Sequence, residues 1–336
     1  MTGVTGLGDA ARVHLLQREG TTLRMALQRL TTEMGTGRHA DLGRATGGDF
    51  APLAELEQSR HMTETFARTI AEAGVMAGAR QAALGRIETG LEGLAPRLLS
   101  LTAGGSLRDV TLGIADAGAR LDLVVTTLNT RTAGQSMFAG NTPDRAALIP
   151  AEEMLAHLRP LAAAAATPQD MIAVVEDWFN APGGGYESLA WQGGAGPAAP
   201  AILGEGVAVE TGITALDPAL REVLSGLALL ALTAEGAGPA AGEDRRVLVS
   251  AAAMRLETGE DALIRLRSDL GTSEARIEEA RSATEAARAT LDLEIARITG
   301  ADPYRTATEL EAVETRLEAL YILTARLSRL TLSEYL

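Results

Sequence analysis

The chain has 336 residues, which allows two or three domains, and 46% of them are hydrophobic while only 3% are aromatic. A formal net charge of −14 argues against binding to nucleic acid or insertion into an anionic membrane, because both favour a basic surface. Cysteine is absent and all 30 lysine-plus-arginine positions hold arginine. Disulfides, thiolate metal sites, a Walker A loop and a Schiff-base lysine are therefore excluded.

Both ends of the chain carry apolar residues at alternating three- and four-residue steps, the pattern of a coiled-coil helix. Near the start these are Val13, Leu16, Gly20, Leu23, Leu27, Leu30 and Met34, and near the end Leu310, Val313, Leu317, Leu320, Thr324 and Leu327. An isolated helix cannot bury such a seam, so we expect the ends to pair with each other or with other copies. The sequence predicts an assembly interface of Val13, Leu16, Leu23, Leu27, Leu30, Leu310, Val313, Leu317, Leu320 and Leu327.

Three further long helices are expected between the ends. The first spans residues 52–98 and contains several glycines, which need close packing to offset their cost in a helix. The second spans residues 107–138, because apolar residues repeat at helical steps from Leu107 to Leu128. The third spans residues 245–298. It stops at Gly300, after which Asp302 as N-cap and Pro303 as first residue begin the last helix.

The character of the chain changes between residues 139 and 242. Nine of the 12 prolines and both tryptophans, Trp178 and Trp191, lie in this segment. Short helices are expected at 151–159, 168–180 and 217–234, and strands within YESLAW and the alternating VAVETGI. The segment is predicted to be a small α+β insert that can be removed without loss of the helical arms.

Motifs that could carry chemistry are weak. GLGDAA at residues 6–11 fits a dinucleotide-binding pattern only formally, because no strand precedes it. The four histidines, His14, His39, His61 and His157, show no metal-ligand spacing, and no GxSxG motif is present. The adjacent acids Glu152 and Glu153, and Glu278 and Glu279, point in different directions on a helix. We therefore expect no enzyme, no catalytic or metal site and no cofactor.

Two stretches resemble the flagellin superfamily. The first is the C-terminal run ARSATEAARATLDLEIARITGADPYRTATELEAVETRLEALYILTARLSRLTLSEYL, and the second is SMFAGNTPD at residues 136–144. The ending YILTARLSRLTLSEYL resembles the hook–filament junction branch of the superfamily more than the flagellins. Where the family usually has an acidic motif after its first helix, this chain has only Asp49.

The resemblance implies a mainly α fold, in which N- and C-terminal arms form a long bundle or coiled coil with a small α+β insert. Residues 1–40 and 301–336 would form an axial terminal coiled coil. Residues 41–138 and 243–300 would form a helical core, and residues 139–242 an outward variable insert.

The resemblance also implies a function. The chain would be a structural subunit of the bacterial flagellum that joins hook to filament and assembles with copies of itself through its terminal helices. Its neighbours would be a hook-associated protein and flagellin, and a cytoplasmic chaperone would hold it before export. No signal-peptide pattern is seen at the start, so export to the extracellular flagellum without cleavage is expected. Two alternatives stay open: a flagellin of the filament, or a coiled-coil adaptor outside the flagellum.

Overall fold

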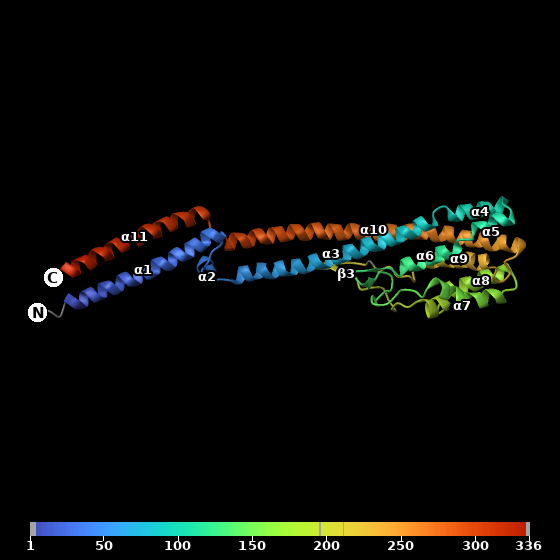
Figure 1. The fold of residues 1–336 in the computed structure, drawn as a ribbon, viewed down its shortest axis with the longest axis horizontal. Coiled ribbons are helices and arrows are strands. Elements are labelled where there is room, and N and C mark those ends of the chain that lie inside the picture. The colour runs from blue at the N-terminus through green and yellow to red at the C-terminus, as the bar shows by residue number, and fades with distance from the viewer. Residues whose placement is uncertain (1–4, 195, 211, 334–336) are drawn as a thin grey trace. The chain divides into compact units, whose positions relative to one another are not determined.

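The computed structural model describes the backbone of residues 5–194, 196–210 and 212–333, and the side chains of residues 11–194, 196–210 and 212–326 (Figure 1). The α-helices are α1 Thr5–Thr36, α2 Leu42–Ala45, α3 Ala51–Leu91, α4 Leu94–Gly104, α5 Leu107–Gly113, α6 Ala117–Leu128, α7 Ala151–Ala164, α8 Pro168–Asn180, α9 Pro218–Glu235, α10 Gly242–Thr299 and α11 Pro303–Ser333. A π-helical turn, η1, spans Tyr186–Ala190. The strands β1 Arg131–Thr132 and β2 Gln135–Ser136 form one antiparallel pair, and β3 Ala201–Gly204 and β4 Val207–Val209 form another.

The predicted fold class is confirmed, because long helices dominate and the described sheets have two strands each. The chain divides into two compact units, one of residues 1–64 with 285–336 and one of residues 65–284. The limits of the three domains predicted from the sequence stay a prediction. Each unit is described by itself below.

The unit of residues 65–284 has one continuous apolar core. It joins α3, α4 and α6 to α7, α8, α9 and α10, from Ile70 on α3 to Ile277 on α10. Helix α9 lies deepest, with 13 of its 18 residues buried. It approaches α10 closely at Gly226, where an added Cβ would lie only 3.0 Å from Leu256. A larger residue at 226 would therefore force the two helices apart.

Two of the expected long helices are interrupted. The helix expected at 52–98 ends at Leu91, because Gly93 adopts φ 69° and α4 then begins at Leu94. The left-handed conformation is one that glycine adopts without strain, and glycine is common just past the end of a helix. The sequence pattern continued smoothly across this break because Leu91, Leu94 and Leu98 are all buried.

The helix expected at 107–138 is also wrong in its extent. Helix α5 ends at Gly113 and α6 begins at Ala117, joined by a tight turn in which the Ala117 amide donates to the Ile114 carbonyl at 3.0 Å. Ile114 and Ala117 stay buried on either side of the turn, so the apolar spacing does not reveal it. Helix α6 ends at Leu128, where the side chain of Asn129 exchanges two 2.9 Å hydrogen bonds with the backbone of Leu148.

Residues 131–136 then form the β1–β2 hairpin instead of the end of that helix. Its turn places Ala133 and Gly134 at φ 51° and 81°, the two positive φ values that a two-residue hairpin turn requires.

The helices of the segment 139–242 match expectation more closely. Helix α8 begins and ends at the expected residues, and Thr167 and Asp170 form a capping box at its start. Helices α7 and α9 lie where short helices were expected. The alternating VAVETGI contains β4, as expected, paired with β3.

The strand expected in YESLAW is wrong, because this segment forms the π-helical turn η1. Tyr186 packs against Phe179, with ring centroids 5.3 Å apart, and against the edge of Trp178. Its hydroxyl donates to the Ala215 carbonyl at 2.6 Å. Complete burial raises the pKa of the Tyr186 phenol, so the group stays a neutral donor. Tertiary packing of an aromatic ring here overrides the strand propensity of the segment.

The last expected joint is confirmed. Helix α10 runs unbroken for 58 residues to Thr299, and α11 begins at Pro303. The Asp302 carboxylate accepts from the amides of Tyr304 at 2.9 Å and Arg305 at 3.2 Å. Asp302 is thus the N-cap that its place before proline indicated.

Replacing Tyr186 by Phe should lower the free energy of unfolding of the 65–284 unit by about 1–2 kcal/mol, because the Ala215 carbonyl loses its buried donor. Urea unfolding followed by circular dichroism measures the change. The matched control is Tyr304→Phe, since Tyr304 is 84% exposed and should tolerate the loss of its hydroxyl. Equal stability of Y186F and the wild type would contradict the role given to this bond.

Removing residues 141–242, by joining Gly140 to Glu243 through a short linker, should expose the apolar faces of α6 and α10 that α9 covers. We therefore expect loss of helical far-UV signal, contrary to the expectation from sequence that the insert is removable. A deletion variant that keeps the helical signal of the remaining residues and unfolds cooperatively would show that α9 is dispensable.

Candidate assembly site

The two terminal helices, α1 and α11, lie side by side and run in opposite directions (Figure 1). Leu23, Leu30 and Leu320 are buried. The other partly buried residues of the predicted interface are Leu16, Leu27, Leu310, Val313 and Leu317. Together these eight residues form a seam within the chain, which we call the inner seam. Of the remaining predicted residues, Val13 is 53% exposed, and the side chain of Leu327 lies outside the described residues.

Gly20 interrupts the inner seam on α1. A Cβ at this position would lie 3.4 Å from Cδ2 of Leu320, so the leucine of α11 occupies the space that the missing side chain leaves. Glycine costs about 1 kcal/mol relative to alanine inside a helix. The close approach of the two helices at Leu320 is what offsets this cost.

The inner seam leaves much apolar surface uncovered. Tyr321, Ile322 and Leu323 are each about half exposed, at 47%, 51% and 52%, and they follow directly after buried Leu320. Consecutive residues point to different sides of a helix, so this part of α11 is apolar all round. A helix of this kind is normally buried on all sides, which means that α1 alone does not complete its environment.

A backbone joint closes the pair of terminal helices. Arg38 and Gly300 form an antiparallel bridge. The amide of His39 donates to the Thr299 carbonyl at 2.8 Å, and the amide of Ala301 donates to the Gly37 carbonyl at 3.0 Å. A Cβ on Gly300 would lie 2.5 Å from the Ala296 carbonyl oxygen. The joint therefore requires glycine at 300.

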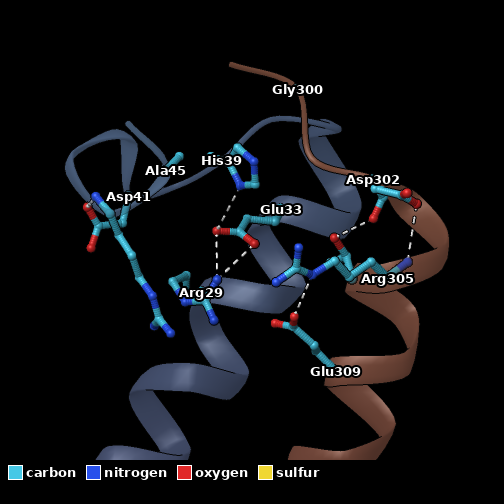
Figure 2. Close-up of a pocket in the computed structure, with 11 residues that line it drawn as sticks. Arg29, Glu33, His39, Asp41, Ala45, Gly300, Asp302, Arg305 and Glu309 are labelled. Carbon is cyan, nitrogen blue, oxygen red and sulfur yellow. Dashed lines mark hydrogen bonds and ion pairs between the residues drawn. The ribbon is translucent and has the colours of Figure 1, made fainter. Parts of the chain in front are cut away.

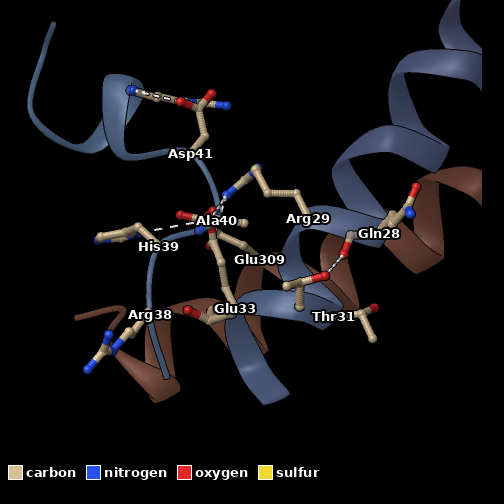
Figure 3. A network of polar contacts seen from close by, with 12 residues as sticks. Gln28, Arg29, Thr31, Glu33, Arg38, His39, Ala40, Asp41 and Glu309 are labelled. Atoms are coloured by element: carbon tan, nitrogen blue, oxygen red, sulfur yellow. Dashed lines mark hydrogen bonds and ion pairs between the residues drawn. The ribbon is translucent and has the colours of Figure 1, made fainter. Parts of the chain in front are cut away.

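The side chain of Glu33 holds the segment that leaves α1 (Figure 3). Its carboxylate is 4% exposed and accepts two 2.9 Å hydrogen bonds from Nη1 of Arg29. It also accepts from the Ala40 amide at 3.2 Å, and Nδ1 of His39 lies 3.9 Å away. One buried acid thus ties the last turn of α1 to the chain that follows it.

Sequence reasoning missed Glu33, although a signal was present. A carboxylate in the last turn of a helix is unfavourable, because the helix dipole places negative partial charge there. Arg29 stands four residues earlier on the same face. An acid in an unfavourable position with a built-in partner indicates a tertiary role.

A polar cavity of about 340 Å³ lies beside this joint (Figure 2). Arg29 and Arg44 line it from the N-terminal side, and Asp302, the N-cap of α11, lines it together with Arg305 and Glu309 of that helix. Arg305 pairs with Glu309 at 3.0 Å. The cavity contains acids and arginines in mixed order, which suits structural ion pairs better than acid–base catalysis.

The other candidates for chemistry are placed apart. His14, His61 and His157 lie on α1, α3 and α7, and only His39 lines the cavity at the joint. Residues 11–194, 196–210 and 212–326 contain no group of three His, Asp or Glu side chains that could hold a metal ion. In the same described part of the chain, no helix is long and apolar enough to cross a membrane.

One acid of each adjacent pair, Glu152 and Glu278, forms a surface ion pair. Glu152 binds Arg159 at 2.7 Å, and Arg159 also binds Glu235. These two hydrogen-bonded carboxylates raise the pKa of the Arg159 guanidinium, and Arg159 lowers the pKa of Glu152. Glu278 pairs with Arg281 at 3.0 Å. Glu152 and Glu278 are therefore each paired with an arginine at the surface.

Replacing Glu33 by Gln should loosen the joint, because a neutral amide cannot hold the Arg29 guanidinium as a carboxylate does. The amides of His39 and Ala40 should exchange hydrogen at least several-fold faster, which mass spectrometry of exchanged peptides would detect. Glu309→Gln is the matched control, since its pair with Arg305 is largely exposed and worth little. Unchanged exchange at Ala40 in E33Q would refute the role of Glu33.

Comparison with known proteins bears on the C-terminal half of the site. Residues 256–336, the later part of α10 with α11, match the bacterial flagellin C-terminal helical region. Comparison with curated proteins gives no match. Among solved structures, a candidate flagellar hook-associated protein from Vibrio parahaemolyticus is similar, with a TM-score of 0.52 and 17% identity over 73% of this chain and 95% of that one. The chain thus has a fold similar to that protein's, and its C-terminal region is similar to that of bacterial flagellins.

Proposed function

We propose that the chain is a structural subunit of the bacterial flagellum that assembles with copies of itself through α1 and α11. One observation carries this proposal: the flagellin-type C-terminal helix buries one face against α1 and leaves Tyr321, Ile322 and Leu323 exposed on its other sides. The similarity in fold to a candidate hook-associated protein, over 73% of this chain, supports the same class. The function is structural, without catalysis.

Within the flagellum, we place the protein at the junction between hook and filament, as hook-associated protein 3. The support is the ending YILTARLSRLTLSEYL together with the similarity in fold to a candidate flagellar hook-associated protein. Its neighbours would be another hook-associated protein on one side and flagellin on the other. A cytoplasmic chaperone would hold the exposed terminal helices before export without a cleaved signal peptide.

A flagellin of the filament is the alternative within the same class. Quantitative mass spectrometry of isolated flagella with their hook–basal bodies separates the two. A small fixed number of copies at the hook end supports the junction role, and copies in the number of the main filament subunit support a flagellin. Absence from the purified organelle would overturn the proposed function.

The proposed role predicts that a charge in the inner seam stops assembly without unfolding the rest of the chain. Leu320→Asp should do so, because burying Leu320 contributes about 1.5–3 kcal/mol and an unpaired buried carboxylate is costly. Limited proteolysis should then remove both terminal helices, while the melting of the 65–284 unit stays unchanged. Electron microscopy of the exported variant measures assembly.

Ala312→Asp serves as the control, since Ala312 is exposed on the same helix and lies outside the inner seam. It should assemble as the wild type does. Normal assembly of L320D, or melting of the 65–284 unit together with the ends, would contradict the separation of roles between the two units.

A further inference from the structure

The side of α1 that faces away from α11 carries a second regular pattern. Leu15, Arg18, Thr22 and Met25 follow at steps of three, four and three residues, so they share one face of the helix. All four are exposed, Leu15 at 66% and Met25 at 59%. We call these four residues the outer seam of α1. Its only charged member is a cation.

The outward side of α11 carries a matching pattern. Tyr304, Glu311 and Glu318 stand seven residues apart, and Ile322 follows one turn later; a seven-residue spacing keeps residues on one face. All four are exposed, Tyr304 at 84% and Ile322 at 51%. We call them the outer seam of α11. Its charged members are both acids.

Within the described part of the chain, the charged residues of both outer seams have no ion-pair partner. Arg18, Glu311 and Glu318 form no ion pair with another described residue, whereas Arg29 and Arg305 on the same helices are paired. Single exposed apolar residues are common on protein surfaces. Apolar residues aligned with charges of one sign on each of two neighbouring helices are the pattern of a helix–helix interface.

We propose that the outer seam of α1 in one copy binds the outer seam of α11 in a neighbouring copy, with Arg18 paired to Glu318 and Leu15 packed on Ile322. This inference rests on the self-assembly proposed above and names the surface that performs it. The contact is heterologous, since each copy offers α1 to one neighbour and α11 to another. Many copies can therefore join in a ring or a helix.

The register of the two helices within the chain is compatible with this contact. Gly20 lies against Leu320, and the helices are antiparallel. Copies related by rotation about an axis along these helices keep α1 of one antiparallel to α11 of the next. Within one chain, Gly20 and Leu320 lie at the same height along the helix axes. Relative to that alignment, Arg18 and Glu318 are four residues out of register, and Leu15 and Ile322 are three residues out of register in the same direction. One axial shift of about 5 Å aligns both pairs.

A charge swap in the full-length chain tests the pairing of Arg18 with Glu318. Arg18→Glu and Glu318→Arg should each weaken self-association about tenfold or more, because like charges then face each other. The double variant R18E/E318R should recover most of the lost affinity. Sedimentation velocity over a concentration series measures it, and circular dichroism verifies that each variant is folded.

Arg24→Glu is the control, because Arg24 is exposed but belongs to neither seam, and it should associate as the wild type does. Wild-type association by both single variants would overturn the proposal. So would a double variant no better than the single ones, or a wild-type chain that stays monomeric at every concentration.

Cysteine cross-linking tests the contact between Leu15 and Ile322 directly, and the chain has no cysteine of its own. A mixture of the single variants L15C and I322C should give disulfide-linked heterodimers on mild oxidation, since a disulfide requires Cβ atoms about 4 Å apart. The pair L15C with A312C, on another side of α11, should give few. Equal yields from the two mixtures would show that the outer seams do not meet.

The two proposals fail separately. If the outer seams cross-link but the protein is absent from flagella, the proposed contact surface stands and the proposed flagellar function is wrong. If the protein is present in flagella but the charge-swap and cross-linking experiments fail, the proposed function stands and the proposed contact surface is wrong.

Discussion

The terminal unit depends on burying a seam that is narrow and is built from the two ends of the chain. Pairing segments so far apart in sequence costs loop-closure entropy, although this cost grows only slowly with loop length. The bridge between Arg38 and Gly300 lowers the remaining entropy cost of pairing the two helices, because it places the end of α1 beside the start of α11. Once the joint has formed, the inner seam closes from neighbouring residues. Glu33 supports this joint, because its carboxylate holds Arg29 and the Ala40 amide at the end of α1.

The two units are stabilised in different ways. The 65–284 unit has a thick interior, in which α9 is covered on nearly all sides and an aromatic cluster fixes the irregular segment around Tyr186. The terminal unit has only one line of buried residues between two helices. A pair of helices with one seam is marginal in water, because ordering each residue costs about 1–2 kcal/mol of backbone entropy. A terminal unit of this design gains its full stability when further surfaces cover α11.

Elements that are set by local sequence signals could be predicted from the sequence, and elements that are set by contacts in the folded chain could not. Local signals sufficed for the start of α8 at its capping box and for the start of α11 at Asp302 and Pro303. They also sufficed for the inner seam, because burial on one side of a helix leaves a periodic trace. The break at 114–116 left none, since Ile114 and Ala117 remain buried across it. The π-helical turn at Tyr186 could not be predicted, because it depends on contacts with Trp178 and Phe179 that only the folded chain creates.

The same distinction applies to the candidate assembly site. The leucine spacing alone indicates the residues of the inner seam, but it does not show that they pack within one chain, since the same spacing also allows pairing with another copy. Val13 shows this limit. It fits the spacing of the inner seam, yet it is exposed in the structure. Glu33 shows the opposite case, in which a residue outside any apolar pattern holds the joint together.

The exclusive use of arginine has a structural consequence in this fold. Segments without regular structure present backbone carbonyls that need donors, and a guanidinium can satisfy several at once, whereas an ammonium acts as a point charge. Arg246 donates to the carbonyls of Thr102 and Gly105 at the end of α4, at 3.1 Å and 2.7 Å. Arg221 donates to the Leu216 carbonyl at 2.8 Å while it binds Glu187. Arg80 donates to Met137, and burial lowers the pKa of its guanidinium.

These arginines lie on helices, and the carbonyls that they bind lie at the end of α4, just after the β1–β2 hairpin and just before α9. Replacing Arg246 by lysine would keep the charge but not the fork that donates to two carbonyls at once, and each lost hydrogen bond would cost about 0.5–1.5 kcal/mol. Whatever the origin of the arginine bias, the chain therefore now depends on it. The paired acids and the forked guanidinium groups hold the irregular segments, and the leucine seams hold the helices.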